Sequence, residues 1–325
     1  MSTAPAVSVV LPVRNRRALL RQALDALDAQ TYRDFEVIVV DDGSTDGSAD
    51  EARADAAAGR AVRVLAGDGG GAVRARTVGV EASSAPYLAF TDSDCVPDPG
   101  WLAAGVAALE EGAEVVQGLT RPTRPPRVME RTVWSDFDDG LFATCNVFYR
   151  RSAYDAAGGF ESTAGERLGF RQGSFLKGMG FGEDTLLGWR VRREGRAAFV
   201  PDAVVGHEVF PVDPVETLRR ALTTGAFPAL MREVPELEHL MGPHLAKRRR
   251  DRVPLYVAAG GLLTGHRRLA TFALGAWVAT RASAVARQEP SWPRRIRMLP
   301  LDLAVEAVTA VALATGSATA RKVVL

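Results

Sequence analysis

Two aspartates, Asp92 and Asp94, stand on either side of Ser93, shortly after an apolar segment at residues 85–90. Two carboxylates this close repel each other unless positive charge lies beside them. Carboxylate oxygens at the end of a strand can hold a hard divalent cation, Mg²⁺ or Mn²⁺, which keeps coordination positions open for diphosphate oxygens and water. The same spacing also occurs in helix caps and solvated turns, so this segment alone leaves a metal site and a turn as alternatives.

A second acidic segment, residues 41–44 (DDGS), follows an apolar run at residues 35–40. Asp-Gly-Ser is common turn chemistry, and Ser44 or Thr45 can cap a following helix. Asp42, however, stands directly after a buried strand. Its carboxylate could there accept the ring N–H of a uracil-like base.

The glycine-rich segment at residues 67–71 (GDGGG) lacks both the phosphate-loop pattern and a clean dinucleotide-binding pattern. We therefore expect a flexible loop that leads into a helix. This helix carries Arg76, whose guanidinium is a candidate partner for a diphosphate because it can donate two parallel hydrogen bonds to phosphate oxygens.

Three further side chains have suitable chemistry. Glu183 and Asp184 begin a predicted helix at residues 183–193, where the helix dipole alone favours acids. A carboxylate beside a metal site could also take the proton from an attacking hydroxyl. His207 ends an apolar segment, and its neutral imidazole could complete the coordination of the metal, although most histidines in such positions are structural.

The elements that must position these residues alternate between short β-branched runs and helical patterns. The expected strands are residues 7–11, 35–40, 62–65, 87–91 and 114–118, and the expected helices are residues 16–30, 44–58, 73–82 and 97–111. This alternation predicts a doubly wound, mostly parallel α/β sheet with right-handed crossovers. Ligands bind outside the carboxyl ends of such strands, and both acidic segments fall at these ends.

The second half of this region has a weaker pattern. Residues 119–135 are rich in proline and arginine, which predicts a loop across the domain, and residues 141–150 are typical of a strand. The glycine-rich residues 158–182 are expected to form a mobile loop over a site. Residues 197–207 predict a pair of strands broken by Pro201-Asp202.

Charge divides the chain into two parts. Of the 40 basic and 39 acidic residues, 23 and 31 lie before residue 215, and 17 and 8 lie from there on. We expect a catalytic domain at residues 1–214 and a C-terminal helical region at residues 215–325. Two cysteines without framework spacing, and an N-terminus without a secretory signal, favour a reducing, cytoplasmic location. We expect no nucleic-acid partner.

The C-terminal region has three apolar stretches, residues 253–265, 269–280 and 307–320. None reaches the ~20 uncharged residues that a membrane-spanning helix needs. Two interpretations stay open. The helices can pack as an amphipathic bundle on the catalytic domain, or they can lie in the headgroup region of an anionic membrane surface as a peripheral attachment.

Taken together, the motifs resemble those of the family 2 glycosyltransferases, which have a GT-A fold. The motifs occur in this order: SVVLPVRNR, VDDGSTDGS, ARTVG, FTDSDCVPDPGW, CNVFYRR, GGF, GFGEDTLLGWRVRREG and VVGH. The resemblance covers about residues 7–210. It implies a GT-A-like sheet and a metal-dependent, inverting transfer of a sugar from a nucleotide-sugar donor to an acceptor hydroxyl.

The resemblance also implies roles for individual residues. The nucleotide-binding set would be Pro12, Arg14, Asp42, Arg76, Asp92 and Ser93. Within it, Asp42 would contact the base, Arg76 the diphosphate, and Asp92 the ribose or metal. The family usually has an aromatic residue at the position of Arg14, where its ring would stack on the base. Arginine at this position departs from that pattern.

By the same resemblance, Asp94 would be the principal ligand of Mn²⁺ or Mg²⁺ and His207 a second ligand. Asp184 would be the general base, supported by Glu183. The acceptor or supporting set would be Trp189, Arg190 and Asn146. A UDP-sugar donor is favoured weakly through Asp42, and the acceptor could be a polysaccharide, a lipid-linked intermediate or a small molecule.

Two other functions remain as alternatives. A nucleotidyltransferase would need a glycine- and lysine-rich phosphate loop near the first strand, which LPVRNRR does not provide. A catalytically inactive binding or scaffold protein could keep the same fold. The intact set of Asp92, Asp94, Glu183, Asp184 and His207 favours an enzyme.

Overall fold

The chain folds into two compact units. A computed structural model describes residues 4–169 and 180–324, and of residues 241–251 it describes the backbone alone. Unit 1 comprises Met1–Arg124, Thr132–Gly165 and Lys177–Val209, and unit 2 comprises Pro125–Arg131, Glu166–Leu176 and Phe210–Leu325. The expected domains at residues 1–214 and 215–325 stay a prediction. Residues 170–179 of the expected mobile loop lie outside the described residues.

Unit 1 is built on one mixed sheet with the strand order β3-β2-β1-β4-β7-β6-β8-β5. The strands are β1 (Val7–Val13), β2 (Phe35–Asp41), β3 (Val62–Ala66), β4 (Tyr87–Phe90), β5 (Cys95–Pro97), β6 (Val115–Pro122), β7 (Val147–Arg150) and β8 (Ala197–His207). Strands β1, β2, β3 and β4 pair in parallel, as the strand–helix alternation predicts. Strand β7 then pairs antiparallel with both β4 and β6. The predicted α/β sheet is therefore confirmed, with antiparallel strands in its second half.

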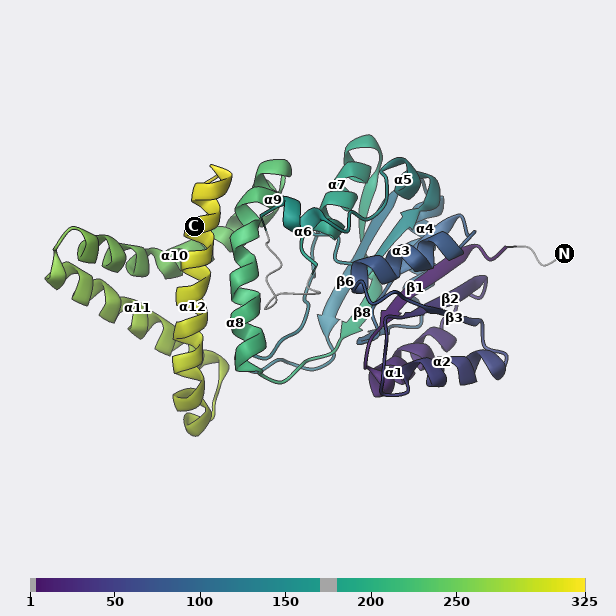
Figure 1. Ribbon diagram of the computed structural model, residues 1–325, viewed down its shortest axis with the longest axis horizontal. Coiled ribbons are helices and arrows are strands. Elements are labelled where there is room, and N and C mark those ends of the chain that lie inside the picture. The colour runs from purple at the N-terminus through teal and green to yellow at the C-terminus, as the bar shows by residue number, and fades with distance from the viewer. Residues whose placement is uncertain (1–3, 170–179, 325) are drawn as a thin grey trace. The chain divides into compact units, whose positions relative to one another are not determined.

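Helices cover both faces of this sheet (Figure 1). The helices of this part of the chain are α1 (Arg17–Asp28), α2 (Ser48–Ala57), α3 (Ala72–Ala82), α4 (Trp101–Glu110), α5 (Arg151–Ala156), α6 (Ala164–Arg167) and α7 (Glu183–Glu194). Side chains of β2 alternate between the faces. Val37 and Val39 belong to the core cluster that includes α1 and α4, whereas Ile38 and Val40 pack with Ala75 of α3. Both faces are apolar because both are buried.

Several local expectations were wrong. Residues 119–122 continue strand β6 instead of starting a loop, and residues 197–207 form one strand with an irregularity opposite Gly118/Leu119. The short strand β5 was not expected. Ser44 and Thr45 do not cap α2, whose N-cap is Gly47. Their polar groups form hydrogen bonds with the loop after β1 instead. Ser44 Oγ, for example, accepts a hydrogen bond from the backbone N–H of Asn15 at 3.0 Å.

Unit 2 is helical in its C-terminal part. Its elements are α8 (Pro214–Thr223), η1 (Thr224–Ala226), α9 (Phe227–Glu233), α10 (Leu237–Leu263), α11 (Arg267–Gln288) and α12 (Trp292–Ala320). The apolar stretches expected at residues 253–265, 269–280 and 307–320 lie within α10, α11 and α12. By length and composition alone, α11 and α12 are long and apolar enough to cross a membrane, which counting uncharged residues did not predict.

Candidate functional site

Four of the predicted site residues lie at the carboxyl ends of strands in the unit 1 sheet. Asp42 follows β2, Asp92 and Asp94 follow β4, and His207 is the last residue of β8. Strand β5 turns back from β4 and pairs antiparallel with β8, with Cys95 opposite His207. This pairing brings the Asp92–Asp94 segment beside a residue more than a hundred positions later in the chain.

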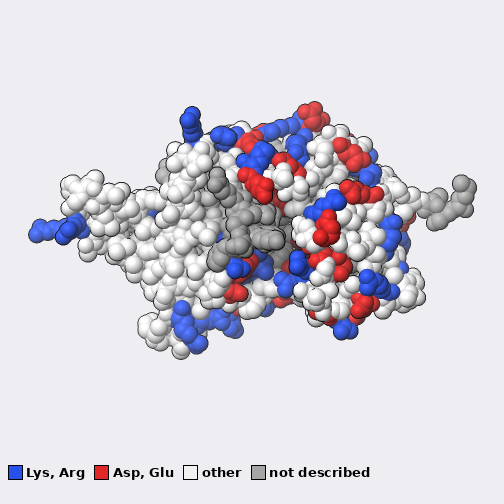
Figure 2. All heavy atoms as spheres, viewed as in Figure 1, with Lys and Arg blue, Asp and Glu red and all other residues white. Residues whose placement is uncertain are grey.

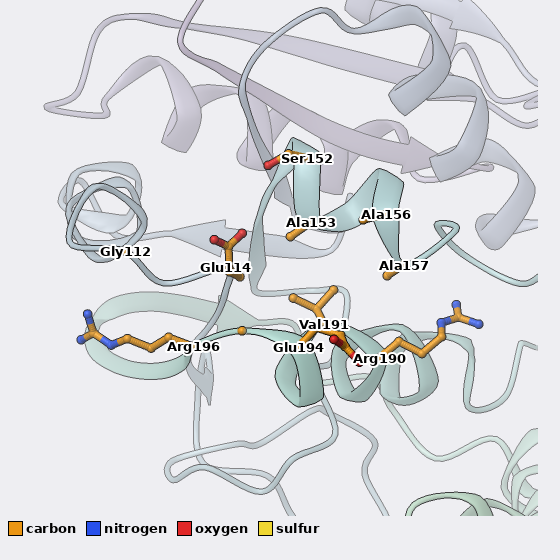
Figure 3. Close-up of a pocket in the computed structure, with 11 residues that line it drawn as sticks. Gly112, Glu114, Ser152, Ala153, Ala156, Ala157, Arg190, Val191, Glu194 and Arg196 are labelled. Atoms are coloured by element: carbon orange, nitrogen blue, oxygen red, sulfur yellow. The ribbon is translucent and has the colours of Figure 1, made fainter.

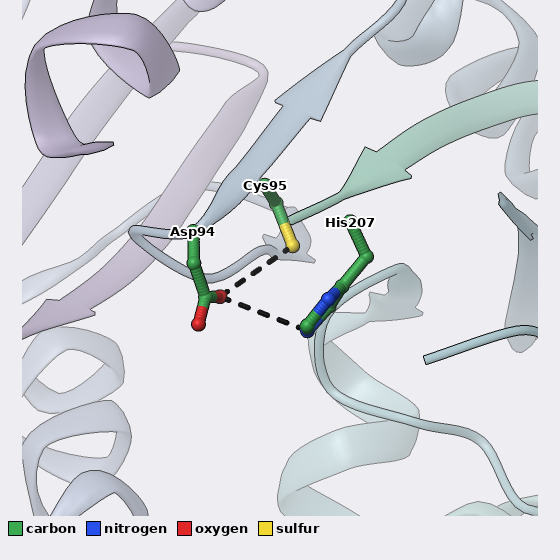
Figure 4. A group of neighbouring side chains, drawn as sticks. All are labelled: Asp94, Cys95 and His207. Carbon is green, nitrogen blue, oxygen red and sulfur yellow. Dashed lines mark hydrogen bonds and ion pairs between the residues drawn. The ribbon is translucent and has the colours of Figure 1, made fainter. Parts of the chain in front are cut away.

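Asp94, Cys95 and His207 form a cluster in which each residue offers one potential ligand atom (Figure 4). His207 Nε2 lies 3.8 Å from Asp94 Oδ1, and the three ligand atoms lie within 4.8 Å of one another. Two ligands of one Mg²⁺ or Mn²⁺, each bound at about 2.0–2.2 Å, can take the separation of Asp94 and His207. The donor set therefore fits a divalent cation.

The hydrogen bonds of His207 prepare Nε2 for this role. His207 Nδ1 lies 2.9 Å from the carbonyl oxygen of Glu208. Because a carbonyl oxygen can only accept, Nδ1 carries the proton in this bond, and in the neutral ring Nε2 keeps a lone pair on the side of Asp94. The backbone of Glu208 also donates to the carbonyl of Asp94 at 2.9 Å, which ties the two segments together.

Cys95 is a member of this cluster that the sequence did not suggest. Its thiol is 4.0 Å from Asp94 Oδ1 and lies in the core. Burial, followed by the neighbouring Cys145, raises the pKa of the Cys95 thiol well above its usual value. A neutral thiol is a poor ligand for Mg²⁺ or Mn²⁺, so Asp94 and His207 are the better candidates.

Asp92 points to a different partner. Its carboxylate accepts a hydrogen bond of 2.5 Å from Arg76 Nη2. The Arg76 side chain is buried, and it also interacts electrostatically with Glu183 and Asp184. Burial lowers the pKa of Arg76, but Asp92 and the two further carboxylates outweigh this effect and raise it. The guanidinium of Arg76 beside Asp92 thus relieves part of the repulsion between Asp92 and Asp94.

Glu183 and Asp184 form the first turn of α7, after Gly182 in the left-handed conformation. Burial raises the pKa of Glu183, and Glu183 Oε2 has no hydrogen-bond partner among the described residues. Asp184 remains partly exposed, and its Oδ1 accepts from the backbone of Thr185 at 2.7 Å. Burial and the adjacent Glu183 raise the pKa of Asp184 to about 7. A carboxylate with this pKa can accept a proton near neutral pH.

Tyr149 lies near this carboxylate pair. Like Cys95, it is a residue that the sequence did not suggest. It lies on β7, and its buried hydroxyl has no hydrogen-bond partner among the described residues. Burial, followed by the negative charge of Asp184, raises the pKa of the Tyr149 hydroxyl well above its usual value. Tyr149 therefore stays a neutral phenol. Its position depends on the antiparallel pairing of β7 with β4. The spacing of residues in the sequence does not reveal this pairing.

Asp42 forms the other end of the site. Its Oδ2 accepts from the backbone of Gly71 at 3.0 Å, and its Oδ1 is buried without a hydrogen-bond partner among the described residues. A Cβ atom added to Gly67 would lie 2.9 Å from this Oδ1. Glycine at position 67 thus leaves space beside this acceptor atom, which has no donor among the described residues. A ring N–H of a bound base could donate a hydrogen bond to it there.

The neighbouring nucleotide-binding candidates differ in exposure. Pro12 is buried within β1, where it pairs with Val40 of β2. Arg14 is exposed, and its guanidinium lies 3.7 Å from Asp42 Oδ2. Ser93 is buried between the two aspartates. Arg14 therefore places a cation beside Asp42, at the position where the resemblance led us to expect an aromatic ring.

Two of the three acceptor or supporting candidates, Asn146 and Trp189, are buried in unit 1. Asn146 is buried, and its amide accepts from the Trp101 indole at 2.8 Å and donates to the carbonyls of Leu119 and Ala203 at 2.9 Å each. Trp189 donates to the carbonyl of Gly140 at 2.8 Å. These contacts stabilise the fold around the site. Their roles toward an acceptor stay predictions.

Arg190 lies at a pocket of about 350 Å³ near the starts of β6 and β8 (Figure 3). The pocket is lined by residues of α5, α7 and the segments before the two strands, including Glu114, Ser152 and Arg196. Arg190 also donates to the carbonyl of Gly159 at 2.7 Å. Of the predicted site residues, only Arg190 lines this pocket, and the acidic clusters lie at the opposite ends of the parallel strands.

Comparison with known proteins agrees with this arrangement. Residues 8–156 match the model of the family "Glycosyl transferase family 2". This match covers a little less than half of the chain. It includes β1 to β7 and the segments that carry Asp42, Arg76, Asp92 and Asp94.

Curated relatives of this chain include glycosyltransferase AglE of Haloferax volcanii, 34% identical over 49% of this chain and 57% of the relative. Another is validoxylamine A glucosyltransferase of Streptomyces hygroscopicus, 42% identical over 33% of this chain and 26% of the relative. The chain thus spans little more than half the length of the first relative and about a quarter of the second.

Solved structures share the fold of this chain. One is the mannosyltransferase PcManGT of Pyrobaculum calidifontis in complex with GDP-Man and Mn²⁺, with a TM-score of 0.55, 20% identity, and coverage of 95% of this chain and 88% of that chain. Another is S. aureus TarS 1-349 in complex with UDP-GlcNAc, with a TM-score of 0.56, 16% identity, and coverage of 97% and 92%. The predicted GT-A fold is therefore confirmed.

Proposed function

We propose that this protein is a metal-dependent, inverting glycosyltransferase that moves a sugar from a nucleotide-sugar donor to an acceptor hydroxyl. One observation carries the proposal. Asp184, whose pKa is raised to about 7, interacts electrostatically with Arg76. Arg76 also donates a hydrogen bond to Asp92, which lies in the same segment as the metal-ligand candidate Asp94. A proton acceptor and a site for a diphosphate-bound cation are thus positioned by the same few elements.

The proposed donor is a sugar linked to a nucleoside diphosphate. The unpartnered Oδ1 of Asp42 supports base binding at the end of β2, where it would accept the ring N–H of uracil. Guanine also has a ring N–H, so this contact favours UDP over GDP only weakly. Solved structures with the same fold hold UDP-GlcNAc in one case and GDP-Man in another.

Asp94 and His207 would hold Mn²⁺ or Mg²⁺. When bound, such an ion would stabilise the negative charge that develops on the departing nucleoside diphosphate. The 3.8 Å separation of the two ligand atoms and the hydrogen bond that orients His207 support this assignment. The complex of PcManGT with Mn²⁺ shows that a protein of this fold can hold such an ion.

Asp184 would act as the general base. It would remove the proton from the acceptor hydroxyl while the acceptor oxygen bonds to the anomeric carbon and the bond from that carbon to the diphosphate oxygen breaks. A single displacement of this kind inverts the anomeric configuration. Glu183 and Arg76 would support Asp184 by setting its pKa from both sides.

The experiment is a nucleotide-release assay with a panel of UDP- and GDP-sugars, candidate acceptors and Mn²⁺. Asp184→Asn keeps the shape of the side chain and removes the base, so we expect turnover to fall by about two to four orders of magnitude. Glu194→Gln is the matched control, because Glu194 is an exposed carboxylate on the same helix α7. Near-wild-type turnover of Asp184→Asn would refute the assigned role.

The same assay tests the two other functions. Pyrophosphate release from nucleoside triphosphates, without turnover of any nucleotide sugar, would instead favour a nucleotidyltransferase. Nucleotide binding without turnover of either kind of substrate would favour a scaffold protein. We also propose a cytoplasmic location with peripheral attachment to an anionic membrane surface, which the basic residues of unit 2 support.

A further inference from the structure

The helices of unit 2 expose large apolar side chains to an unusual extent. The hairpin of α10 and α11 has Leu263 and Phe272 with exposed fractions of 89% and 77%. Its other exposed large apolar residues are Val253, Val257, Leu262, Leu269 and Leu274. Only 22% of the most apolar window of α11 is buried within the protein. A core helix of a water-soluble protein would be mostly buried, so these helices lack the cover that their composition requires.

Charged residues in the same helices are paired toward the inside. Arg281 of α11 makes two hydrogen bonds to Asp302 of α12, at 2.8 and 2.6 Å. Arg252 of α10 donates to Glu306 of α12 at 2.9 Å, and Arg281 also lies 3.9 Å from Glu306. Arg252 and Asp302 are buried, with exposed fractions of 5% and 3%. The two positive and two negative charges of this group, which we call the charge cluster, balance one another.

This distribution is the reverse of that in a water-soluble helical bundle. In water, apolar side chains lie inside and charges outside, because burial removes apolar surface from water and strips charges of hydration. In a lipid layer the preference reverses, and ionisable groups face the protein interior and pair with one another. Leu263 and Phe272 outside and the charge cluster inside therefore fit an apolar surrounding.

Two uncharged arms lead from the charge cluster to the tip of the hairpin. Residues 253–265 and 269–280 each hold a dozen or so residues without a charge, which corresponds to about 18–20 Å of helix. This is shorter than the ~30 Å hydrocarbon core of a bilayer, so the arms are too short to cross it but can lie along its surface with both ends at the level of the headgroups. In Figure 2 the surface over these helices is mostly white, with basic side chains at the end of the hairpin.

From Val253 to Gln288, every exposed charged side chain is basic. Arg267 and Arg268 are exposed at its tip, and Arg287 is exposed at the other end of α11. Exposed Trp292 and Arg297 follow at the start of α12. Long arginine side chains can reach headgroup phosphates while their stems stay in an apolar layer, and tryptophan is enriched at this boundary. Basic residues at both ends complement a negatively charged lipid surface.

We propose that the α10–α11 hairpin, residues 253–280, lies along an anionic lipid bilayer at the boundary between headgroups and acyl chains, with its exposed apolar side chains inserted into the hydrocarbon layer. The acyl chains cover its exposed apolar side chains, the charge cluster keeps Arg252 and Arg281 paired within the bundle, and Arg267 and Arg268 bind lipid phosphates. The inference deepens the peripheral attachment proposed above by naming the inserting segment. It does not depend on the transferase activity.

The first test measures binding and depth with the full chain, without nucleotide or metal. Purified protein is floated with vesicles of phosphatidylcholine alone or mixed with phosphatidylglycerol. For depth, Phe272→Cys is labelled with an environment-sensitive fluorophore, while Cys95 and Cys145 are buried. We expect binding to the anionic vesicles, a blue shift, and stronger quenching by spin labels on the acyl chains than by spin labels on the headgroups.

The second test uses substitutions of exposed residues, which leave the packing intact. Leu263→Glu and Phe272→Glu should each weaken vesicle binding at least about tenfold, since each removes a large apolar contact with lipid. Val323→Glu is the control, because Val323 is also exposed but lies outside the hairpin. Arg267→Gln combined with Arg268→Gln should weaken binding to anionic vesicles about 25-fold, or about fivefold for each basic residue.

Several outcomes would overturn the inference. These are no binding to anionic vesicles at low salt, binding unaffected by Leu263→Glu and Phe272→Glu, or quenching by headgroup labels alone. A wild-type dimer in the absence of vesicles that Leu263→Glu converts to monomers would show that a second copy covers this surface. Nucleotide release measured without vesicles reports separately on the catalytic proposal, so failure of one test leaves the other intact.

Discussion

Arg76 controls the charge balance of the candidate site at the scale of single residues. Its buried guanidinium pairs with Asp92 and interacts with Glu183 and Asp184, so one cation serves three carboxylates. The sequence suggested a diphosphate contact for Arg76. In the structure Arg76 donates a hydrogen bond to Asp92, and its charge lowers the pKa of Asp184 against the effects of burial and Glu183. The diphosphate contact stays a prediction.

The pH dependence of activity should report on this arrangement. Asp184 must be ionised to accept a proton, so we expect kcat/KM to fall about tenfold per pH unit below about 7, the pKa of Asp184. Because this pKa is raised from 3.8, ionisation of Asp184 also removes folding stability as the pH rises through about 7. Arg76→Met should move the acidic limb of the profile to higher pH, and Arg76→Lys should move it less. An unchanged limb in Arg76→Met would contradict this role.

Gly67 provides a second prediction at the residue scale. Alanine there would place its Cβ 2.9 Å from Asp42 Oδ1 and 3.2 Å from the carbonyl of Asp41. We expect Gly67→Ala to displace the Asp42 carboxylate and weaken nucleotide affinity about tenfold, which equals about 1.4 kcal/mol. Isothermal titration with UDP and GDP measures the change. Gly100→Ala is the control, since a Cβ at Gly100 meets no atom within 4 Å, and equal affinities in the two variants would count against base binding at Asp42.

At the scale of elements, short strand β5 has the largest effect on the site. Its pairing with β8 places Cys95 opposite His207, and so brings Asp94 to the imidazole. Helix α7 has a similar effect at the other carboxylates. It begins with Glu183 and Asp184 after Gly182, whose φ of +78° lets the chain turn into the helix. Helix α7 thus carries two site residues in its first turn, and β5 fixes the position of Asp94, the residue directly before it.

The charge cluster of unit 2 gives a prediction at the same scale. Arg281→Met would leave Asp302 buried without its main partner, so we expect a loss of about 3–5 kcal/mol in the free energy of unfolding. Adding Asp302→Leu should restore most of this loss, because both charges are then gone. Urea denaturation of the full chain in detergent measures it, with Arg287→Met as the control on the exposed end of α11. Equal stability of Arg281→Met and wild type would show that the pair contributes nothing.

For the whole molecule, nucleotide and metal should stabilise the protein together. A ligand at a hundred times its Kd adds about 2.7 kcal/mol to the free energy of unfolding. For a chain of this size we expect the melting temperature of unit 1 to rise by about 5–10 °C with UDP or GDP and Mn²⁺. Asp94→Ala and His207→Ala should each remove the part of the shift that depends on metal. A shift of the same size after chelation would contradict a metal-assisted site.

Much of the first half of unit 1 could be predicted from the sequence. Its strands are parallel and buried on both faces, so they appear as unbroken apolar runs that end at polar residues. The acidic segments at 41–44 and 92–94 were therefore placed at strand ends correctly. The second half could not be read in this way. Strand β5 is only three residues long, and the antiparallel positions of β7 and β8 depend on partners far away in the sequence.

The sequence by itself determined which carboxylates and which histidine are available for chemistry, and the order of the motifs that resemble those of the family 2 glycosyltransferases. Residue type and spacing are read directly from the sequence, and the local periodicity of apolar residues shows which of these residues follow strands or begin helices. Only the tertiary structure decided the pairings: Arg76 with Asp92, His207 with Asp94, and Arg281 with Asp302. It also decided which apolar helices remain uncovered. Pairing and burial depend on contacts between residues that are distant in the chain, and composition alone does not encode which of the possible contacts form.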